Sequence, residues 1–132
     1  METIAPRSVA FIVCDGVHRD PSGKPYLLGV LRGANSDVFP FTHPPLAVFV
    51  ALTDGYGPTS ITIRLVDARD DEPVYESTML ARFGSPRVVY DTVLPVENVV
   101  FRGPGEYYWQ MCCGAEVLHE IRFIVLNDGE IG

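Results

Sequence analysis

The residues best suited to chemistry lie together in the stretch "GEYYWQMCCGAEVLHEIRFIVL" (105–126). It contains the chain's one Trp, two of its three cysteines (Cys112 and Cys113) and His119. A pair of thiolates binds metal most readily at C-x-x-C spacing, because both sulfurs must converge on one ion. Adjacent residues of a β-strand point to opposite faces instead. We therefore expect a structural pair, with Cys113 in the core and Cys112 a surface thiol or one covered by a partner.

His119 is expected to be a hydrogen-bonded residue at a sheet edge. Acid–base catalysis needs a nucleophile and a group that orients the imidazole, and the neighbouring Glu120 should point the other way along a strand. The chain has no Walker loop, G-x-S-x-G elbow or H-E-x-x-H motif. We expect no catalytic residue and no cofactor. An enzyme that uses His119, His18 or a cysteine remains an alternative.

Acidic residues in the turns are the candidates for a cation or carbohydrate site. They are Asp15 and Asp20 around "CDGVHRDPSGK", Asp67 and Asp70 in "DARDDE", and Asp54. Calcium requires about six or more oxygen ligands, and the D-x-D-x-D-G spacing is absent. We expect Asp20 to start a turn by bonding the backbone, and "DARDDE" to be a solvated tip. The weak metal candidates are Asp15, Asp20, Asp67 and Asp70.

Length and charge restrict the class of protein. The 132 residues predict one domain over 1–132, and 47% apolar residues supply enough material for a core. The net charge of −7 argues against nucleic acid and against anionic membranes. The odd number of cysteines argues against a disulfide framework, and the first residues lack a basic region and a cleavage site. We expect a cytoplasmic protein.

Short apolar or alternating runs between Gly and Pro residues predict an all-β chain. The stretch 33–45 has no period and is expected to be an extended loop or an edge crossing. The stretch 74–83 is ambiguous, because Tyr75, Met79 and Phe83 have helical spacing, but a strand is preferred. The expected strands are 8–15, 25–32, 46–53, 60–67, 74–83, 87–94 and two within 105–126 joined near Gly114.

The register of the last two strands indicates which side chains enter the core. Tyr107, Trp109, Met111 and Cys113 share one face of the first strand. The inward residues of the returning strand are expected to be Val117, Ile121, Phe123 and Val125.

This pattern resembles the last two strands of immunoglobulin-like sandwiches, in which a Tyr near the start of the penultimate strand bonds back to the backbone. Tyr107 is the matching residue, with Trp109 as a second structural residue, and the Cys…Trp…Cys signature of antibody domains is absent. The chain also resembles small uncharacterised bacterial β-sandwich proteins, through "CDG…D.SGK.YLLGV" (14–30), "P.L.V.V.LTDG" (45–55) and "GPGEYYWQM" (103–111). The resemblance implies a single-domain antiparallel β-sandwich, immunoglobulin-like, with seven to nine strands.

Excess apolar residues favour a binding function. Strand 46–53 is apolar on both faces, since Ala47, Phe49 and Ala51 lie opposite a second apolar set. Either a loop or another chain must cover the extra face. We expect a non-catalytic interaction module that binds a protein partner, or a second copy as a homo-oligomer, through a sheet face or edge. The candidate interaction residues are Phe39, Phe41, Phe49 and Tyr56, and the alternative is a cation- or carbohydrate-binding sandwich that uses loop carboxylates.

Overall fold

The structure, a computed structural model, describes residues 3–128, and its elements are strands. The all-β prediction is confirmed, and residues 72–83 form a strand. The strands number eleven rather than seven to nine, because three short ones lie in stretches without alternating polarity. The strands are β1 (Arg7–Arg19), β2 (Pro25–Val30), β3 (Gly33–Ser36), β4 (Phe41–Thr42), β5 (Leu46–Thr53), β6 (Gly57–Asp67), β7 (Glu72–Phe83), β8 (Tyr90–Val96), β9 (Val100–Phe101), β10 (Gly105–Cys113) and β11 (Glu116–Asn127).

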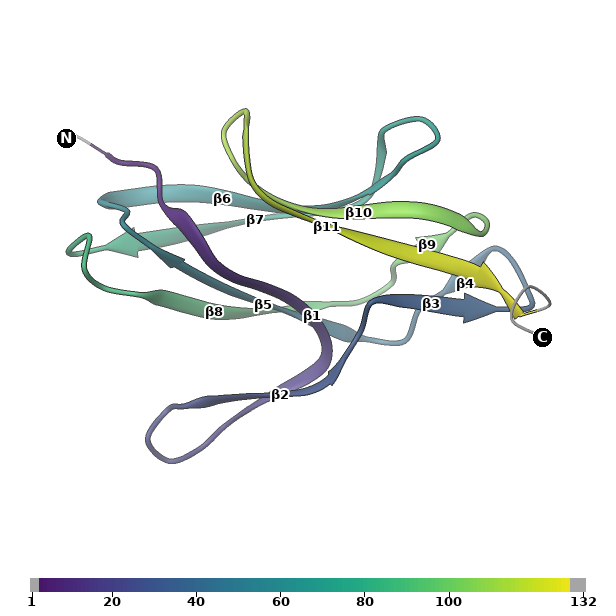
Figure 1. Cartoon of the computed structure of the whole chain (residues 1–132), viewed down its shortest axis with the longest axis horizontal. Coiled ribbons are helices and arrows are strands. Elements are labelled where there is room, and N and C mark those ends of the chain that lie inside the picture. Colours follow the sequence, from purple (N-terminus) through teal and green to yellow (C-terminus); the bar gives the residue numbers. More distant parts are fainter. Residues whose placement is uncertain (1–2, 129–132) are drawn as a thin grey trace.

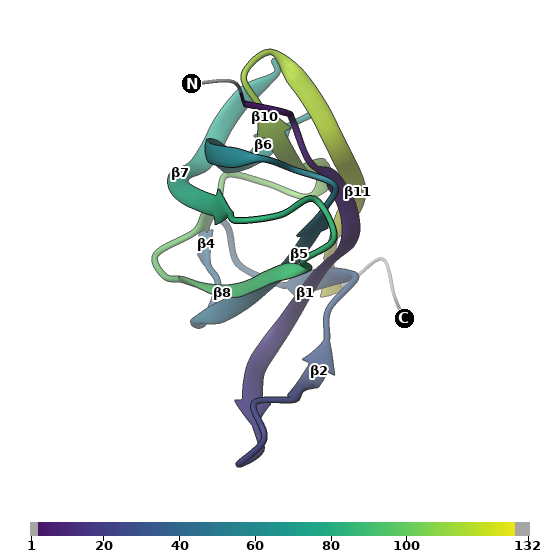
Figure 2. The same ribbon diagram turned by 90° about the vertical axis from the view of Figure 1, so that its left-hand side faces the viewer.

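The strands form two larger sheets and one small one. The four-stranded sheet has the order β2-β1-β5-β8, the five-stranded sheet has the order β3-β11-β10-β6-β7, and β4 pairs with β9. All neighbours are antiparallel except β3, which runs parallel to β11. The two larger sheets lie in two layers around the core (Figures 1 and 2).

The core lies between the layers and is built from alternate residues of β5, β6 and β10. The predicted inward face of β10 is confirmed, because Tyr107, Trp109 and Met111 are fully buried and Cys113 packs partly against the core. Aromatic rings fill the interior, with Phe101 set edge-to-face against Tyr107 at 4.9 Å between centroids and Trp109 edge-to-face against Phe123 at 6.4 Å. The fully buried side chains thus come from both sheets.

A β-bulge changes the register expected for the start of β11. Met111 pairs with His119, whereas Cys112 pairs with Val117, so one extra residue is accommodated. Val117 is therefore exposed and Leu118 packs against the core, which corrects the inward position predicted for Val117. Cys112 is buried rather than at the surface, although Tyr108 and Gln110 on the same face of β10 are only partly buried.

Strand β5 is buried on both faces, and the chain itself covers the second one. Ala47, Phe49 and Ala51 are all buried on the side away from the core, which we call the outer face. Phe49 lies in register between Ile12 of β1 and Val93 of β8. The prediction that Phe49 is an interaction residue is therefore wrong.

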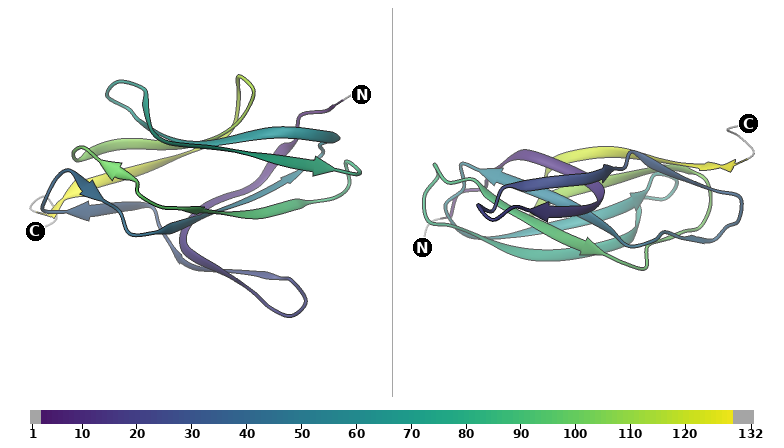
Figure 3. Two further views of the ribbon diagram at one scale, coloured as in Figure 1. Left: turned by 180° about the vertical axis from the view of Figure 1, so that it is seen from behind. Right: turned by 90° about the horizontal axis from the view of Figure 1, so that it is seen from below.

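Strand β1 continues beyond β5 and forms a hairpin with β2. The hairpin (residues 15–30) folds back on the outer side of the four-stranded sheet and stands away from the body (Figures 1 and 3). The side chain of Arg19 at its tip reaches Asp91 of β8, with 2.7 Å between Nη2 and Oδ1. Asp91 pairs with Ala51, so this ion pair lies over the outer face. Within the described residues, no helix is long and apolar enough to cross a membrane.

Candidate functional site

The largest regular row of exposed apolar side chains on one short strand is on β2. Tyr26, Leu28 and Val30 are 46%, 55% and 53% exposed, and they alternate with the partly buried Pro25 and Leu27. We call these three residues the β2 row. Half-exposed apolar side chains at alternate positions of one strand form a continuous apolar strip on that face, in contrast to apolar residues scattered singly over a surface.

The β2 row lies on an edge strand. β2 stands at the end of the sheet order and pairs with β1, through Cys14 to Val30 and Val17 to Leu27, for example. Its other edge has no strand beside it in the described part of the chain. Such an edge presents backbone donors and acceptors to any extended chain that approaches it.

The turn at the tip of the hairpin holds itself together. Oδ1 of Asp20 accepts hydrogen bonds from the backbone N–H of Ser22 and of Lys24, both at 2.9 Å, and from the Ser22 hydroxyl at 2.6 Å. The predicted turn role of Asp20 is thus confirmed. These donors lower the pKa of Asp20 below its usual value, the Ser22 hydroxyl contributing most. Since its bonds go to the turn, Asp20 is a poor cation ligand.

Basic residues mark both ends of β2. Lys24 precedes the strand and Arg32 follows it, and both are exposed. Neither makes an ion pair with a carboxylate in residues 3–128. Arg19 differs, because it is bound to Asp91 and to the carbonyl oxygen of Gly23.

The centre of the hairpin carries one carboxylate. Gly29 has φ of +66°, and the Asp15 side chain lies against the position that a Cβ on Gly29 would occupy. A side chain at position 29 would therefore meet both backbone strain and the Asp15 carboxylate. Asp15 is exposed, and by the register of β1 with β2 it lies on the face opposite the β2 row.

One residue of the predicted acidic tip, Asp67, is the buried centre of an ion-pair cluster, whereas Asp70 is exposed. The Asp67 carboxylate is fully buried and accepts bonds from Nη2 of Arg69 at 2.9 Å and from Nη2 of Arg102 at 2.8 Å. Arg102 also binds Asp70 at 2.9 Å. The bonds from Arg69 hold the pKa of Asp67 down at about 2, despite the opposing effect of burial. The expectation of a solvated tip is therefore wrong for Asp67, because two guanidinium groups replace its water.

This cluster adjoins the corner bond expected for Tyr107, which is present. The Tyr107 hydroxyl donates to the carbonyl oxygen of Gly103 at 2.7 Å and accepts from Nη2 of Arg69 at 3.2 Å. With Asp67 and Asp70 neutralised by arginines and Asp54 bound to Arg7 at 2.6 Å, few predicted carboxylates are available to a ligand. Within the described residues, no group of three or more His, Cys, Asp or Glu side chains is arranged to hold a metal ion.

His119 joins the two sheets at one edge. Its Nδ1 lies 2.7 Å from the hydroxyl of Ser8 on β1, and its ring packs against Phe11 at 5.6 Å between centroids. A depression of about 420 Å³ lies beside the pair, lined by residues 6–8 and 116–119. Residues 3–128 supply no hydrogen-bond partner that would orient the other ring nitrogen. The position matches the predicted edge histidine, and the three histidines do not meet, since His18 contacts Tyr26 and His43 contacts Phe101.

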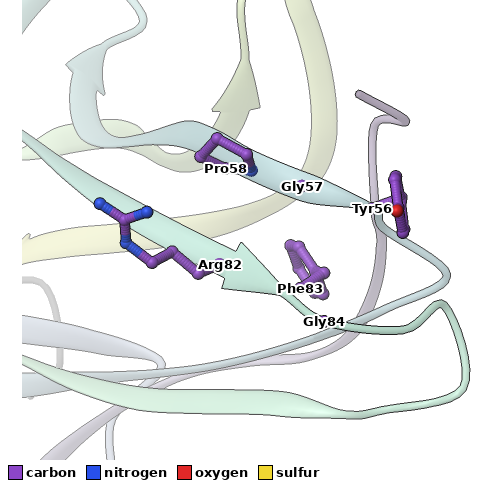
Figure 4. A pocket seen from close by; sticks show the side chains of 6 residues that line it. All are labelled: Tyr56, Gly57, Pro58, Arg82, Phe83 and Gly84. Atoms are coloured by element: carbon purple, nitrogen blue, oxygen red, sulfur yellow. The ribbon is translucent and has the colours of Figure 1, made fainter. Parts of the chain in front are cut away.

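A second pocket contains Tyr56. It has a volume of about 320 Å³ and is lined by residues 56–58 at the start of β6 and 82–84 at the end of β7 (Figure 4). Tyr56 is exposed, as an interaction residue must be. Phe39 and Phe41 are half buried against the core, and Phe41 stacks on Phe101 at 6.2 Å. The structure thus leaves Tyr56 as the most accessible of the four predicted interaction residues.

All three thiols are free, and burial raises the pKa of Cys14, Cys112 and Cys113 above the usual value. A raised pKa reduces the thiolate fraction at neutral pH, so none is activated as a nucleophile. Cys112 and Cys113 remain consistent with packing roles.

Sequence reasoning missed the β2 row. The signal is present in "YLLGVL" (26–31), which is apolar in both alternations around a single glycine. A strand that is apolar on both faces is usually central, so the composition alone hides its place at an edge.

Comparisons with known proteins identify one family. The model of DUF6941, a family of unknown function, matches residues 9–126. No curated protein matches the chain. Among solved structures, the chain is similar to an immunoglobulin-like protein (PA1606) from Pseudomonas aeruginosa, with 15% sequence identity and a TM-score of 0.47 over 93% of this chain and 98% of that one.

Proposed function

We propose that this chain, which belongs to DUF6941, a family of unknown function, is a non-catalytic interaction module that binds another protein through strand β2. The observation that carries the proposal is the β2 row, three half-exposed apolar side chains on a strand with a free edge. An added strand from a partner satisfies the backbone groups of that edge and covers the row at the same time.

The apolar row makes such binding favourable. Covering the remaining exposed half of side chains of this size contributes roughly 1 kcal/mol each. The row stands on a hairpin that projects from the rest of the ribbon (Figure 2). The Arg19–Asp91 ion pair ties the tip to the sheet, which reduces the conformational freedom lost on binding.

We further propose that the two layers are an immunoglobulin-like sandwich. The long strands in chain order are β1, β5, β6, β7, β8, β10 and β11. Read as A, B, C, C′, E, F and G, they give sheets A-B-E and G-F-C-C′, the division expected of this architecture. The Tyr107 corner at the start of the F position supports the assignment. The fold leaves function open, because immunoglobulin-like sandwiches carry many functions.

The net charge of the chain and its free thiols favour a protein partner and a cytoplasmic location. A net charge of −7 disfavours nucleic acid and anionic lipid. Free cysteines are typical of a reducing compartment. The cation- or carbohydrate-binding alternative draws little support, because Asp20, Asp54, Asp67 and Asp70 are already bonded within the chain.

The test is a matched pair of surface substitutions. Leu28→Glu places a charge in the β2 row, and Leu80→Glu places one at a 47% exposed leucine on β7, the edge strand of the other sheet. Thermal melting first checks that the wild type and both variants are equally stable. The three proteins then serve as baits in quantitative affinity capture from host lysate. A stoichiometric partner that is lost with Leu28→Glu and kept with Leu80→Glu supports the proposal. Unchanged capture by Leu28→Glu, or no partner for any of the three proteins, overturns it.

A further inference from the structure

We infer that the segment added to β2 is an extended strand of about nine residues with an acidic residue at each end and apolar residues alternating between them. This inference rests on the proposed function and specifies the chemistry of the partner. It follows from the basic residues that stand at the two ends of the free edge, Lys24 and Arg32.

The distance between the two basic residues sets the length of the segment. Lys24 directly precedes β2, which has six residues, and Arg32 follows it by two positions. A partner strand that reaches both residues therefore needs about nine residues in extended form.

The basic side chains at the two ends of β2 are available for ion pairs with a partner. Lys24 and Arg32 are exposed and have no carboxylate partner in the described part of the chain, whereas Arg19 is already bound to Asp91. The chain carries a net charge of −7, yet the segment 15–32 holds three basic and two acidic residues. This segment is thus less acidic than the rest of the protein, which favours the approach of an acidic segment here over the remaining surface.

The centre of the edge is apolar. Asp15 lies against Gly29, but Cys14 pairs with Val30 and Gly16 with Leu28, so by strand alternation Asp15 and Gly29 face the side opposite the β2 row. The β2 row thus offers apolar contacts between the two basic ends, and the acidic residues of the partner are expected at the ends of its strand.

The same charges disfavour a second copy as the occupant. In an antiparallel pairing of two β2 strands, Lys24 of one copy would face Arg32 of the other. In a parallel pairing each basic residue would face its own equivalent. Both arrangements bring like charges together at both ends, so a different chain is the better partner.

The experiment uses two labelled nine-residue peptides. Both have alternating valine and threonine in the centre; one has a glutamate at each end and the other a lysine. Fluorescence anisotropy with the full chain is expected to show about five- to tenfold tighter binding of the glutamate peptide, with the difference shrinking at high salt. The double substitution Lys24→Glu with Arg32→Glu is expected to reverse the preference. Equal binding of both peptides, or preference for the lysine peptide, overturns the inference.

The Leu28→Glu variant separates this inference from the proposed function. If Leu28→Glu weakens both peptides while wild type does not distinguish their charges, β2 is a binding edge and only the charge inference fails. If both peptides bind Leu28→Glu as tightly as wild type, both proposals fail. Sedimentation of the chain without peptide tests whether a second copy of the chain binds at β2. A dimer that Leu28→Glu dissociates would overturn the choice of an acidic strand. Thermal melting of each variant confirms that these exposed substitutions leave the fold intact.

Discussion

The hydroxyl of Tyr107 donates a 2.7 Å hydrogen bond to the carbonyl oxygen of Gly103, which lies in the connection between β9 and β10. The hydroxyl oxygen of Tyr107 also accepts a bond from Arg69, whose guanidinium binds the buried carboxylate of Asp67 as well. One side chain thus links the start of β10 to the turn after β6. The bond from Tyr107 to Gly103 is buried. Its loss would therefore leave the Gly103 carbonyl oxygen without a partner at a place that water does not readily reach.

Replacing Tyr107 with phenylalanine removes this bond and keeps the ring. We expect Tyr107→Phe to lower the free energy of unfolding by about 1–3 kcal/mol, since the Gly103 carbonyl and one Arg69 donor lose their partner. Urea denaturation at neutral pH measures the change. The matched control is Tyr108→Phe, whose hydroxyl bonds the exposed Glu106 at 3.0 Å and whose loss is expected to cost less than about 0.5 kcal/mol. Equal costs for the two variants would contradict a structural role for the corner bond.

The Asp67 carboxylate makes stability depend on pH in the acid range. Its folded-state pKa of about 2 lies below the ordinary value of 3.8. Its contribution, about 2 kcal/mol, is therefore complete above pH 4 and is lost as the pH falls through about 2. Asp67→Asn cannot titrate, so the gap in unfolding free energy between wild type and variant is expected to narrow from pH 5 to pH 2. A gap that stays constant over this range would show that the charge of Asp67 does not stabilise the fold.

The long strands that appear in the sequence as apolar or alternating runs were predictable. Leu46–Thr53 was predicted to the residue, and the inward positions of Tyr107, Trp109 and Met111 followed from alternation alone. The bulge near Val117 was not predictable, because one extra residue leaves no mark in composition. It changes the facing of Val117 and Leu118, while Phe123 and Val125 keep their predicted inward positions.

The site was less predictable than the fold for a similar reason. Phe49 looked like surplus apolar surface, but its neighbours in the sheet are Ile12 and Val93, which come from distant parts of the chain. Asp67 was expected to be solvated, but it pairs with Arg102, which lies 35 positions later in the chain. The exposure of Tyr26, Leu28 and Val30 depends on the hairpin leaving the body. Each outcome is decided by long-range contacts that local patterns do not encode.

The three thiols are expected to react slowly in the folded protein. Burial raises the pKa of Cys14 and Cys112, and both are shielded from reagents, while Cys113 is partly exposed. Alkylation with iodoacetamide at pH 7.5, followed by mass spectrometry, is expected to label Cys113 first and the other two only on unfolding. Rapid labelling of Cys112 in the native protein would contradict its buried position.

Gly29 is expected to be essential for the shape of the β1–β2 hairpin. With φ of +66° and the Asp15 carboxylate against the site of a Cβ, Gly29→Ala meets backbone strain and a steric conflict, and we expect it to destabilise the protein by about 1–3 kcal/mol. Gly16→Ala is the control in the paired strand, because no atom lies near its Cβ position and its φ is not positive; a change within about 1 kcal/mol is expected. Urea denaturation gives both values, and hydrogen exchange of residues 15–30 is expected to accelerate in Gly29→Ala alone. Equal exchange in the two variants would show that the β2 edge does not depend on the left-handed conformation of Gly29.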